Sequence, residues 1–281
     1  MITAEQHLLA DFANWTVLAL LLGLLAHHGL RRTAAEPAGN VPRGASKAAP
    51  DVFDLLVALG LVFLLRSQVA SSSAPLPPGP PSERAAADVV AGVSAMVLLG
   101  LVLMVYLRGA RGRSLTDWFG MGARPVPWLV RWTLGLGVPA FVVVYGTSTA
   151  AEHFIWQPLG FGATPQEAVE IFTSADSFVL RLLMGVSACV VAPVIEETIF
   201  RGFLYPVFKR FTHAGFAAVF TALFFGVVHA NLGAFLPLSV LGLVLVFAWE
   251  RGGLLLPVAL HALFNTASLV LMAVTQPPSS P

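Results

Sequence analysis

Long apolar runs alternate with short polar segments along most of the chain. A helix needs about 20 mainly apolar residues to cross the roughly 30 Å hydrocarbon core of a bilayer. Two of the runs, at residues 51–68 and 215–230, are shorter, so their helices are expected to tilt or to enter the membrane only partway. We therefore predict an all-α fold, a polytopic transmembrane helix bundle of about eight spans, at residues 9–29, 51–68, 86–107, 127–147, 178–200, 215–230, 232–250 and 254–274.

Composition agrees with this class, and the placement of charges orients the bundle. Hydrophobic residues make up 57% of the chain and charged residues only 11%, against roughly 25% charged in an average soluble domain. Of the 16 Lys and Arg residues, all except Arg66, Arg84 and Arg181 fall on one side of the predicted bundle. The positive-inside rule places that side in the cytoplasm, so we expect a multi-pass protein of the cell (plasma) membrane. A net charge of +1 gives no indication of a nucleic-acid partner, and the expected surroundings are the lipid bilayer.

Several connecting segments carry too little apolar surface to pack. Residues 69–84 are rich in Pro and Ser and are expected to form an extended external loop. Residues 33–50 are expected to form a disordered cytoplasmic loop, and residues 276–281 a free tail. The Asp-Trp-Phe-Gly run at 117–120 is expected to make an interfacial turn with its aromatic rings at headgroup depth.

Ionisable and amide side chains gather in the last four predicted spans. A charged side chain at membrane depth costs at least ~2.5–3.5 kcal/mol on insertion scales, so a chain that keeps several there is expected to assemble them into a site. We divide the chain into residues 1–177, four spans without a recognised motif, and residues 178–275, a catalytic helix core. The polar side chains of this core are Glu196, Glu197, Arg201, His229, His261 and Asn265.

The two neighbouring glutamates are expected to do different work. Glu197 and Arg201 are four residues apart and share a helix face, so they should form an ion pair in the low-dielectric interior. Glu196 is rotated about 100° from Glu197 and has no local cation in reach. Burial disfavours its charged form, which suits a general base. The simpler alternative is a cytoplasmic helix end with three charges reaching toward water.

The two histidines and the asparagine offer further chemical groups. His229 ends an apolar stretch, with Phe225 one turn earlier as a packing wall that could fix the imidazole. Taken alone, His229 reads more readily as an interfacial residue bonded to a carbonyl. His261 and Asn265 are also four residues apart, so they can present two hydrogen-bond donors to one point, as an oxyanion hole requires. The alternative for this pair is a polar clamp between packed helices.

Carboxylate, imidazole and amide groups together are the components of a hydrolytic site. Glu196 and His229 could bind and deprotonate a water molecule, while His261 and Asn265 could stabilise a tetrahedral oxyanion. Packing alone does not require this whole set of groups in one bundle. The sequence therefore favours hydrolysis over a purely structural role.

Three motifs resemble those of a known family, the CPBP intramembrane proteases, which include CAAX prenyl endopeptidases and bacteriocin-processing or immunity proteins. The run from Glu196 to Arg201, continued by Gly202, resembles the family's EExxxR motif. Phe225 to His229 resembles its FxxxH motif, and His261 to Asn265 its HxxxN motif. The resemblance covers approximately residues 178–272. The three motifs follow in the family's order on successive apolar helices.

The resemblance implies a glutamate-dependent intramembrane endopeptidase that uses no metal and no other cofactor. Glu196 would be the base for water, His229 would share that water, and His261 and Asn265 would bind the oxyanion. Glu197 and Arg201 would be supporting residues, as would Phe225. The implied substrates are peptides or membrane proteins, prenylated CAAX-like tails among them, and the implied active site opens toward the cytoplasm.

Two alternatives stay open at this stage. A zinc-dependent membrane protease could use Glu196, His229 and His261 as a two-histidine, one-carboxylate ligand set, although the HExxH helix motif is absent. A proton-coupled transporter or a non-catalytic membrane scaffold could also keep buried Glu and His residues. A transporter more often has a repeated half with interrupted helices, and the sequence has no such repeat.

Overall fold

The computed structural model describes residues 4–33, 49–71, 81–122, 124–161, 172 and 178–275. These segments contain helices and no strand, as the sequence predicted. The first part holds α1 (Ala4–Thr33), α2 (Val52–Ser71), α3 (Pro81–Val105), the π-helix η1 (Tyr106–Ala110), α4 (Leu115–Trp118), α5 (Val126–Ala151) and the π-helix η2 (Glu152–Trp156). The second part holds α7 (Phe178–Val186), η3 (Ser187–Val191), α8 (Ala192–Ile199), η4 (Phe200–Leu204), α9 (Tyr205–Phe211), α10 (Ala214–Val227), α11 (Leu232–Gly252) and α12 (Leu255–Thr275).

Seven helical segments of the described chain are long and apolar enough to cross a bilayer, and they match seven of the eight predicted spans. The exception is the span expected at 215–230. It forms α10, whose 14 residues reach only about 21 Å at 1.5 Å per residue. The fold class is an all-α polytopic bundle, but α10 is too short to count as a span by length.

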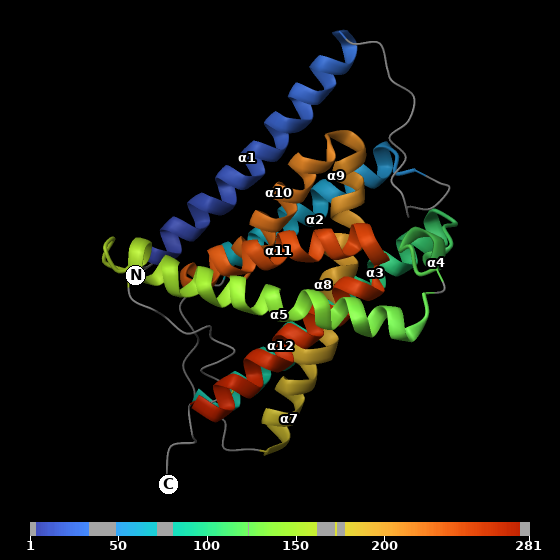
Figure 1. The fold of residues 1–281 in the computed structure, drawn as a ribbon. Helices are drawn as coiled ribbons and strands as arrows, with labels where there is room; N and C mark the ends of the chain where they lie inside the picture. Colours follow the sequence, from blue (N-terminus) through green and yellow to red (C-terminus); the bar gives the residue numbers. More distant parts are fainter. Residues whose placement is uncertain are drawn as a thin grey trace.

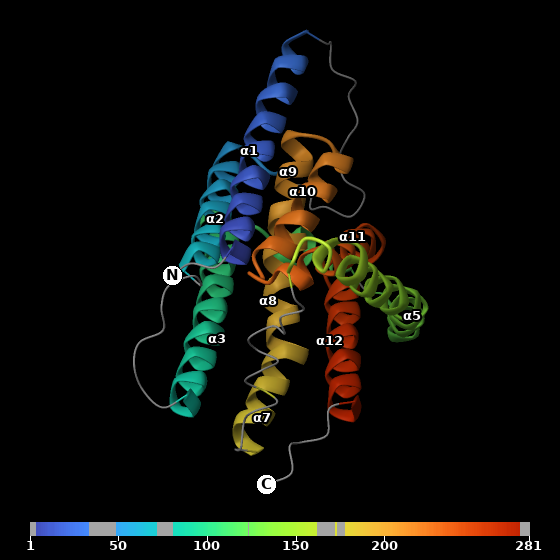
Figure 2. The same ribbon diagram turned by 90° about the vertical axis from the view of Figure 1, so that its left-hand side faces the viewer.

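One long helical run occupies the centre of the molecule. It extends from Phe178 to Phe211 and is interrupted by the π-turns η3 and η4, which flank α8 on both sides. Figure 2 shows α8 between α3 and α12, while α5 lies on the outside against α11 and α12. Figure 1 shows α1 running diagonally past α10 and α11. The helix that carries the two glutamates thus lies between α3 from the first part of the chain and α12 from the second.

Small residues let the helices approach closely beside α8. A Cβ atom on Gly100 of α3 would lie 2.8 Å from the Ile195 side chain, and one on Gly242 of α11 would lie 2.8 Å from the Ala222 backbone of α10. Small residues commonly mark close helix crossings in membranes. The first crossing brings α3 close to α8, and the second brings α11 close to α10.

The Asp-Trp-Phe-Gly segment packs its aromatic rings inside the protein, and its depth in the bilayer stays a prediction. Trp118 and Phe119 are only 4% and 2% exposed, so both rings pack against the protein and not against the surroundings. The guanidinium of Arg113 lies 5.0 Å from the Trp118 ring and pairs with the fully buried Asp54 of α2.

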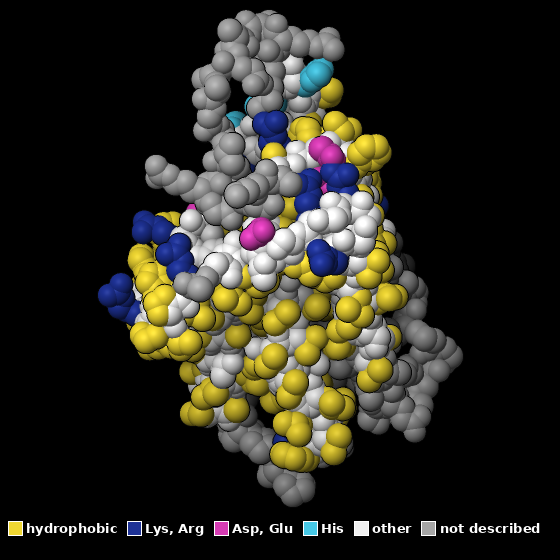
Figure 3. Space-filling model, turned by 90° about the vertical axis from the view of Figure 1, so that its right-hand side faces the viewer, with side chains coloured by type: hydrophobic (Ala, Val, Ile, Leu, Met, Phe, Trp, Pro, Cys, Tyr) yellow, Lys and Arg dark blue, Asp and Glu magenta, His cyan; other side chains and the backbone are white. Residues whose placement is uncertain are grey.

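The predicted loops lie mostly outside the described residues. Residues 34–48, 72–80 and 276–281 are not described. The ends of the expected 69–84 loop are helical, since α2 continues to Ser71 and α3 begins at Pro81. On the face drawn in Figure 3, most Lys and Arg side chains lie in the upper half, above a broad apolar surface.

Candidate active site

Glu197 lies at the centre of a buried ion-pair network. Its Oε1 accepts hydrogen bonds from Arg201 Nη1 at 2.7 Å and from His261 Nδ1 at 2.9 Å. Arg201 also donates to the Gly242 carbonyl of α11 at 3.2 Å, and its guanidinium lies 4.4 Å from the centre of the Phe225 ring. The Glu197 and Arg201 side chains are both fully buried. The predicted ion pair is present, and it joins α8, η4, α11 and α12.

Glu196 turns toward both histidines. Its Oε2 lies 3.9 Å from Nε2 of His229 and 3.9 Å from Nε2 of His261. This oxygen is buried and has no hydrogen-bond partner among the described protein atoms. The separation is too long for a direct hydrogen bond but suits a shared small molecule between carboxylate and imidazole. Three side chains predicted to converge are therefore brought together from α8, the end of α10 and α12.

Backbone and carboxylate acceptors fix the orientation of both imidazoles. His229 Nδ1 lies 2.6 Å from the Phe225 carbonyl, one of the last carbonyls of α10, so Nδ1 is the protonated donor. His261 Nδ1 likewise donates to Glu197. In the neutral rings this leaves Nε2 as an acceptor on the side of Glu196 in both cases.

Phe225 forms the wall behind the two imidazoles. Its ring is fully buried and meets His229 edge to face at 4.7 Å between ring centres, and His261 at 5.7 Å. The Phe225 ring also contacts the Arg201 guanidinium. This position agrees with the expected packing role, because a rotation of either histidine ring would collide with the phenyl group.

Asn265 makes a contact that its spacing did not predict. It lies one turn after His261 on α12, and its Nδ2 donates to the Ala188 carbonyl of η3 at 2.8 Å. No described hydrogen bond joins it to Glu196 or to the histidines. An amide nitrogen carries two N–H groups, so one donor remains after the bond to Ala188.

Two supporting contacts of the site were not predicted from the sequence. Trp118 Nε1 donates to the Gly202 carbonyl of η4 at 2.9 Å. A signal for this bond exists, because Pro206 has no N–H to donate to the carbonyl four residues earlier. The second contact, from Arg201 to the Gly242 carbonyl, has no signal in the sequence beyond the small residue itself.

Among the described residues, no group of three or more His, Cys, Asp or Glu side chains is arranged to hold a metal ion. The described site thus consists of one carboxylate facing two oriented imidazoles, supported by a second carboxylate in a buried ion pair. Such an arrangement can bind a water molecule and accept its proton.

The comparisons with known proteins cover the part of the chain that holds this site. The family model described as "Type II CAAX prenyl endopeptidase Rce1-like" matches residues 178–267. The Bacillus subtilis (strain 168) protein "Putative membrane peptidase YdiL" is 20% identical over 185 residues, which cover 66% of this chain and 70% of that protein. No solved structure matches. The matched region contains every residue predicted for the site, and over this region the chain is similar to CAAX-type membrane proteases.

Proposed function

We propose that the protein hydrolyses a peptide bond within or next to the bilayer, with a water molecule activated by Glu196 and His229. The observation that carries this proposal is the 3.9 Å distance from Glu196 Oε2 to both imidazole Nε2 atoms. A water with hydrogen bonds of about 2.8 Å to the carboxylate and to one imidazole spans such a distance when the angle at the water is roughly 90°. The buried Oε2 is the acceptor for the water proton.

Glu196 can carry the proton through both steps of the hydrolysis. Glu196 accepts a proton from water as the water oxygen attacks the carbonyl carbon of the scissile bond. The same proton is then delivered to the leaving amine when the carbon–nitrogen bond breaks. His229, held by the Phe225 carbonyl, accepts the second hydrogen bond of the water and orients it.

His261 and Asn265 are proposed to stabilise the oxyanion. His261 Nε2 would act as the donor from a protonated ring, while Nδ1 stays bound to Glu197. Asn265 contributes the amide N–H that is not used by Ala188. Two donors aimed at a developing negative oxygen are the usual device for lowering the barrier of acyl transfer.

The proposal extends to the class of substrate and to the side of the membrane that the site faces. The proposed substrates are peptides or membrane proteins, with prenylated tails as one class. The protein lies in the plasma membrane, and its site opens toward the cytoplasm. The orientation is supported by the excess of Lys and Arg on one side of the sequence-predicted bundle. Whichever side the site faces, the chemistry at Glu196 is the same.

The test is a comparison of peptides in cells that carry the wild-type protein or the Glu196→Gln variant. We expect membrane-derived fragments that appear only with the wild type, at unchanged protein levels, and that persist when strong chelators are added. Glu152→Gln, a change in the π-helix η2, is the matched control and should retain all fragments. Identical fragment sets with Glu196→Gln would refute the proposal, and loss of fragments with chelators would favour a zinc enzyme instead.

A further inference from the structure

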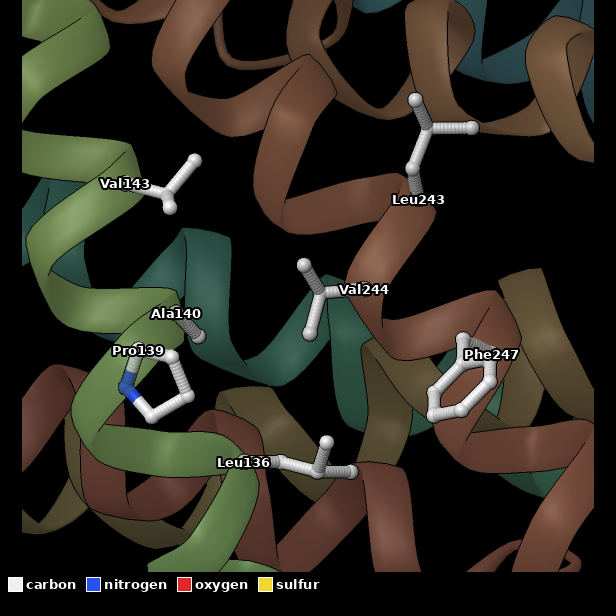
Figure 4. Close-up of a pocket in the computed structure, with 7 residues that line it drawn as sticks. All are labelled: Leu136, Pro139, Ala140, Val143, Leu243, Val244 and Phe247. Carbon is white, nitrogen blue, oxygen red and sulfur yellow. The ribbon is translucent and has the colours of Figure 1, made fainter.

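An open apolar groove runs between α5 and α11. It is lined by α5 residues between Leu136 and Val143 and by α11 residues between Leu243 and Phe247, and its volume is about 350 Å³. Figure 4 shows the side chains of the two helices facing each other across it. Every lining residue is apolar, so the groove offers no partner for a peptide backbone. Its chemistry therefore fits a hydrocarbon chain.

A ladder of arginine and aromatic side chains adjoins the groove at Phe247. The guanidinium of Arg124 lies 4.9 Å from the centre of the Trp128 ring, and Trp128 and Trp132 are 5.8 Å apart. Arg251 lies 5.3 Å from Trp132 and 4.9 Å from Phe247. Phe247 belongs to both features, so the arginine–aromatic ladder and the groove form one continuous surface.

The ladder leaves hydrogen-bond donors unused. Stacking engages the faces of the guanidinium groups, while their N–H donors point outward from the edges. Arg124 and Arg251 are exposed, and neither has a carboxylate partner within the described part of the chain. The Trp132 Nε1 atom is buried and has no acceptor among the described residues. Two exposed cationic side chains thus lie along the ladder that adjoins the apolar groove.

We propose that the groove and the arginine–aromatic ladder bind one anionic phospholipid of the surrounding bilayer. One acyl chain lies between α5 and α11, and the phosphate contacts the guanidinium edges of Arg124 and Arg251. Basic pockets between transmembrane helices recognise anionic headgroups in this way. The positive charge selects against a neutral lipid, and the apolar lining selects against a soluble anion. The site shares no residue with the proposed catalytic group.

The test measures lipid binding to the purified full chain by native mass spectrometry, with phosphatidylglycerol and phosphatidylcholine in competition. We expect the wild type to retain phosphatidylglycerol preferentially. Arg251→Gln should weaken that retention roughly fivefold, the factor given by about 1 kcal/mol for each basic residue near an anionic surface. Arg108→Gln, which alters an exposed arginine in η1, is the matched control and should keep the preference.

A second pair of variants tests the groove itself. Val143 lines the groove and is 52% exposed, while Val142 is 65% exposed and does not line it. Val143→Trp should fill the groove and abolish the preference, and Val142→Trp should not. Equal retention of both lipids by the wild type would overturn the proposal, as would displacement of phosphatidylglycerol by inorganic phosphate alone. Unchanged retention in both Arg251→Gln and Val143→Trp would also overturn it.

Discussion

Glu196 and Glu197 are adjacent in the sequence and both face His261, but they differ in burial and in hydrogen bonding. Glu197 is fully buried and accepts hydrogen bonds from Arg201 and His261, whereas Glu196 remains 17% exposed and faces two imidazole nitrogens without a direct bond. The difference follows from helix geometry, since consecutive residues point about 100° apart. One carboxylate can therefore hold the helices together while its neighbour stays available for proton transfer.

At this scale we predict that Glu197→Gln impairs folding. Arg201 would lose its partner in a fully buried position, and such a broken pair typically costs about 3–5 kcal/mol. Thermal unfolding of the purified protein measures the effect. Glu250→Gln is the matched control, because the Lys209–Glu250 pair is partly exposed and such pairs contribute about 0–1 kcal/mol. Equal melting temperatures for Glu197→Gln and the wild type would contradict the supporting role.

A second prediction concerns the oxyanion donors. We expect His261→Ala and Asn265→Ala each to slow turnover by about 10²–10³, the usual loss for one oxyanion-hole donor. The measurement is kcat on a cleavable membrane peptide. For Asn265→Ala the melting temperature serves as a control, because the variant also loses the exposed bond to the Ala188 carbonyl. Unchanged kcat in both variants would remove these residues from the mechanism.

At the scale of elements, the π-turns and short α4 hold the central helix in place. The two π-turns η3 and η4 flank the helix α8 that carries both glutamates. Such turns are frequent at functional sites because they re-aim the side chains around them. Asn265 bonds to η3 through Ala188, and Trp118 bonds to η4 through Gly202. Each π-turn next to α8 is thus tied to a different neighbouring helix.

We predict that Trp118→Phe destabilises the protein by about 1–3 kcal/mol. The change keeps an aromatic ring but removes the only described donor to the Gly202 carbonyl outside the helix itself, and a buried acceptor left unpaired has this cost. Chemical or thermal unfolding measures it. Trp15→Phe, at a position that is 66% exposed, should leave stability unchanged. Equal effects of the two substitutions would show that the hydrogen bond is unimportant.

The beginning of α2 gives a pH-dependent prediction. Burial raises the pKa of Asp51, but hydrogen bonds from the backbone of Asp54 and Phe53 and from Arg111 outweigh it and leave that pKa below its usual value. Asp51 therefore contributes stability above its unfolded pKa of about 3.9, and this contribution is lost as the pH falls through the lower folded value. In Asp51→Asn the melting temperature should depend less on pH in this acidic range. The same acid dependence in the variant and the wild type would contradict the assignment.

At the scale of the whole molecule, helices from the first 177 residues position those that carry the site. Glu5 of α1 accepts a hydrogen bond from the Leu232 backbone N–H at the start of α11, three residues after His229. Gly100 of α3 packs directly against Ile195, the neighbour of Glu196. The division at residue 177 stays a prediction, but the contacts of the site extend across it.

Much of the fold could be predicted, because the hydropathy of each segment can be read directly from its amino acids. Seven spans and the pairing of Glu197 with Arg201 follow from the length of apolar runs, from helix periodicity and from the cost of buried charge. The burial of Trp118 could not be predicted in this way, because composition does not distinguish an aromatic ring at an interface from one inside the bundle. The π-turns and the bond from Asn265 to Ala188 depend on helix packing, which a single sequence does not specify.

The central claim is that Glu196 is the base that activates water. Its most direct test is the cleavage rate of the purified protein reconstituted in lipid bilayers, compared between the wild type and Glu196→Gln at equal folded fraction. The account predicts a fall of at least about 10²–10⁴ in kcat, the contribution of a positioned general base, with the melting temperature nearly unchanged. A folded Glu196→Gln variant that cleaves at the wild-type rate would contradict it.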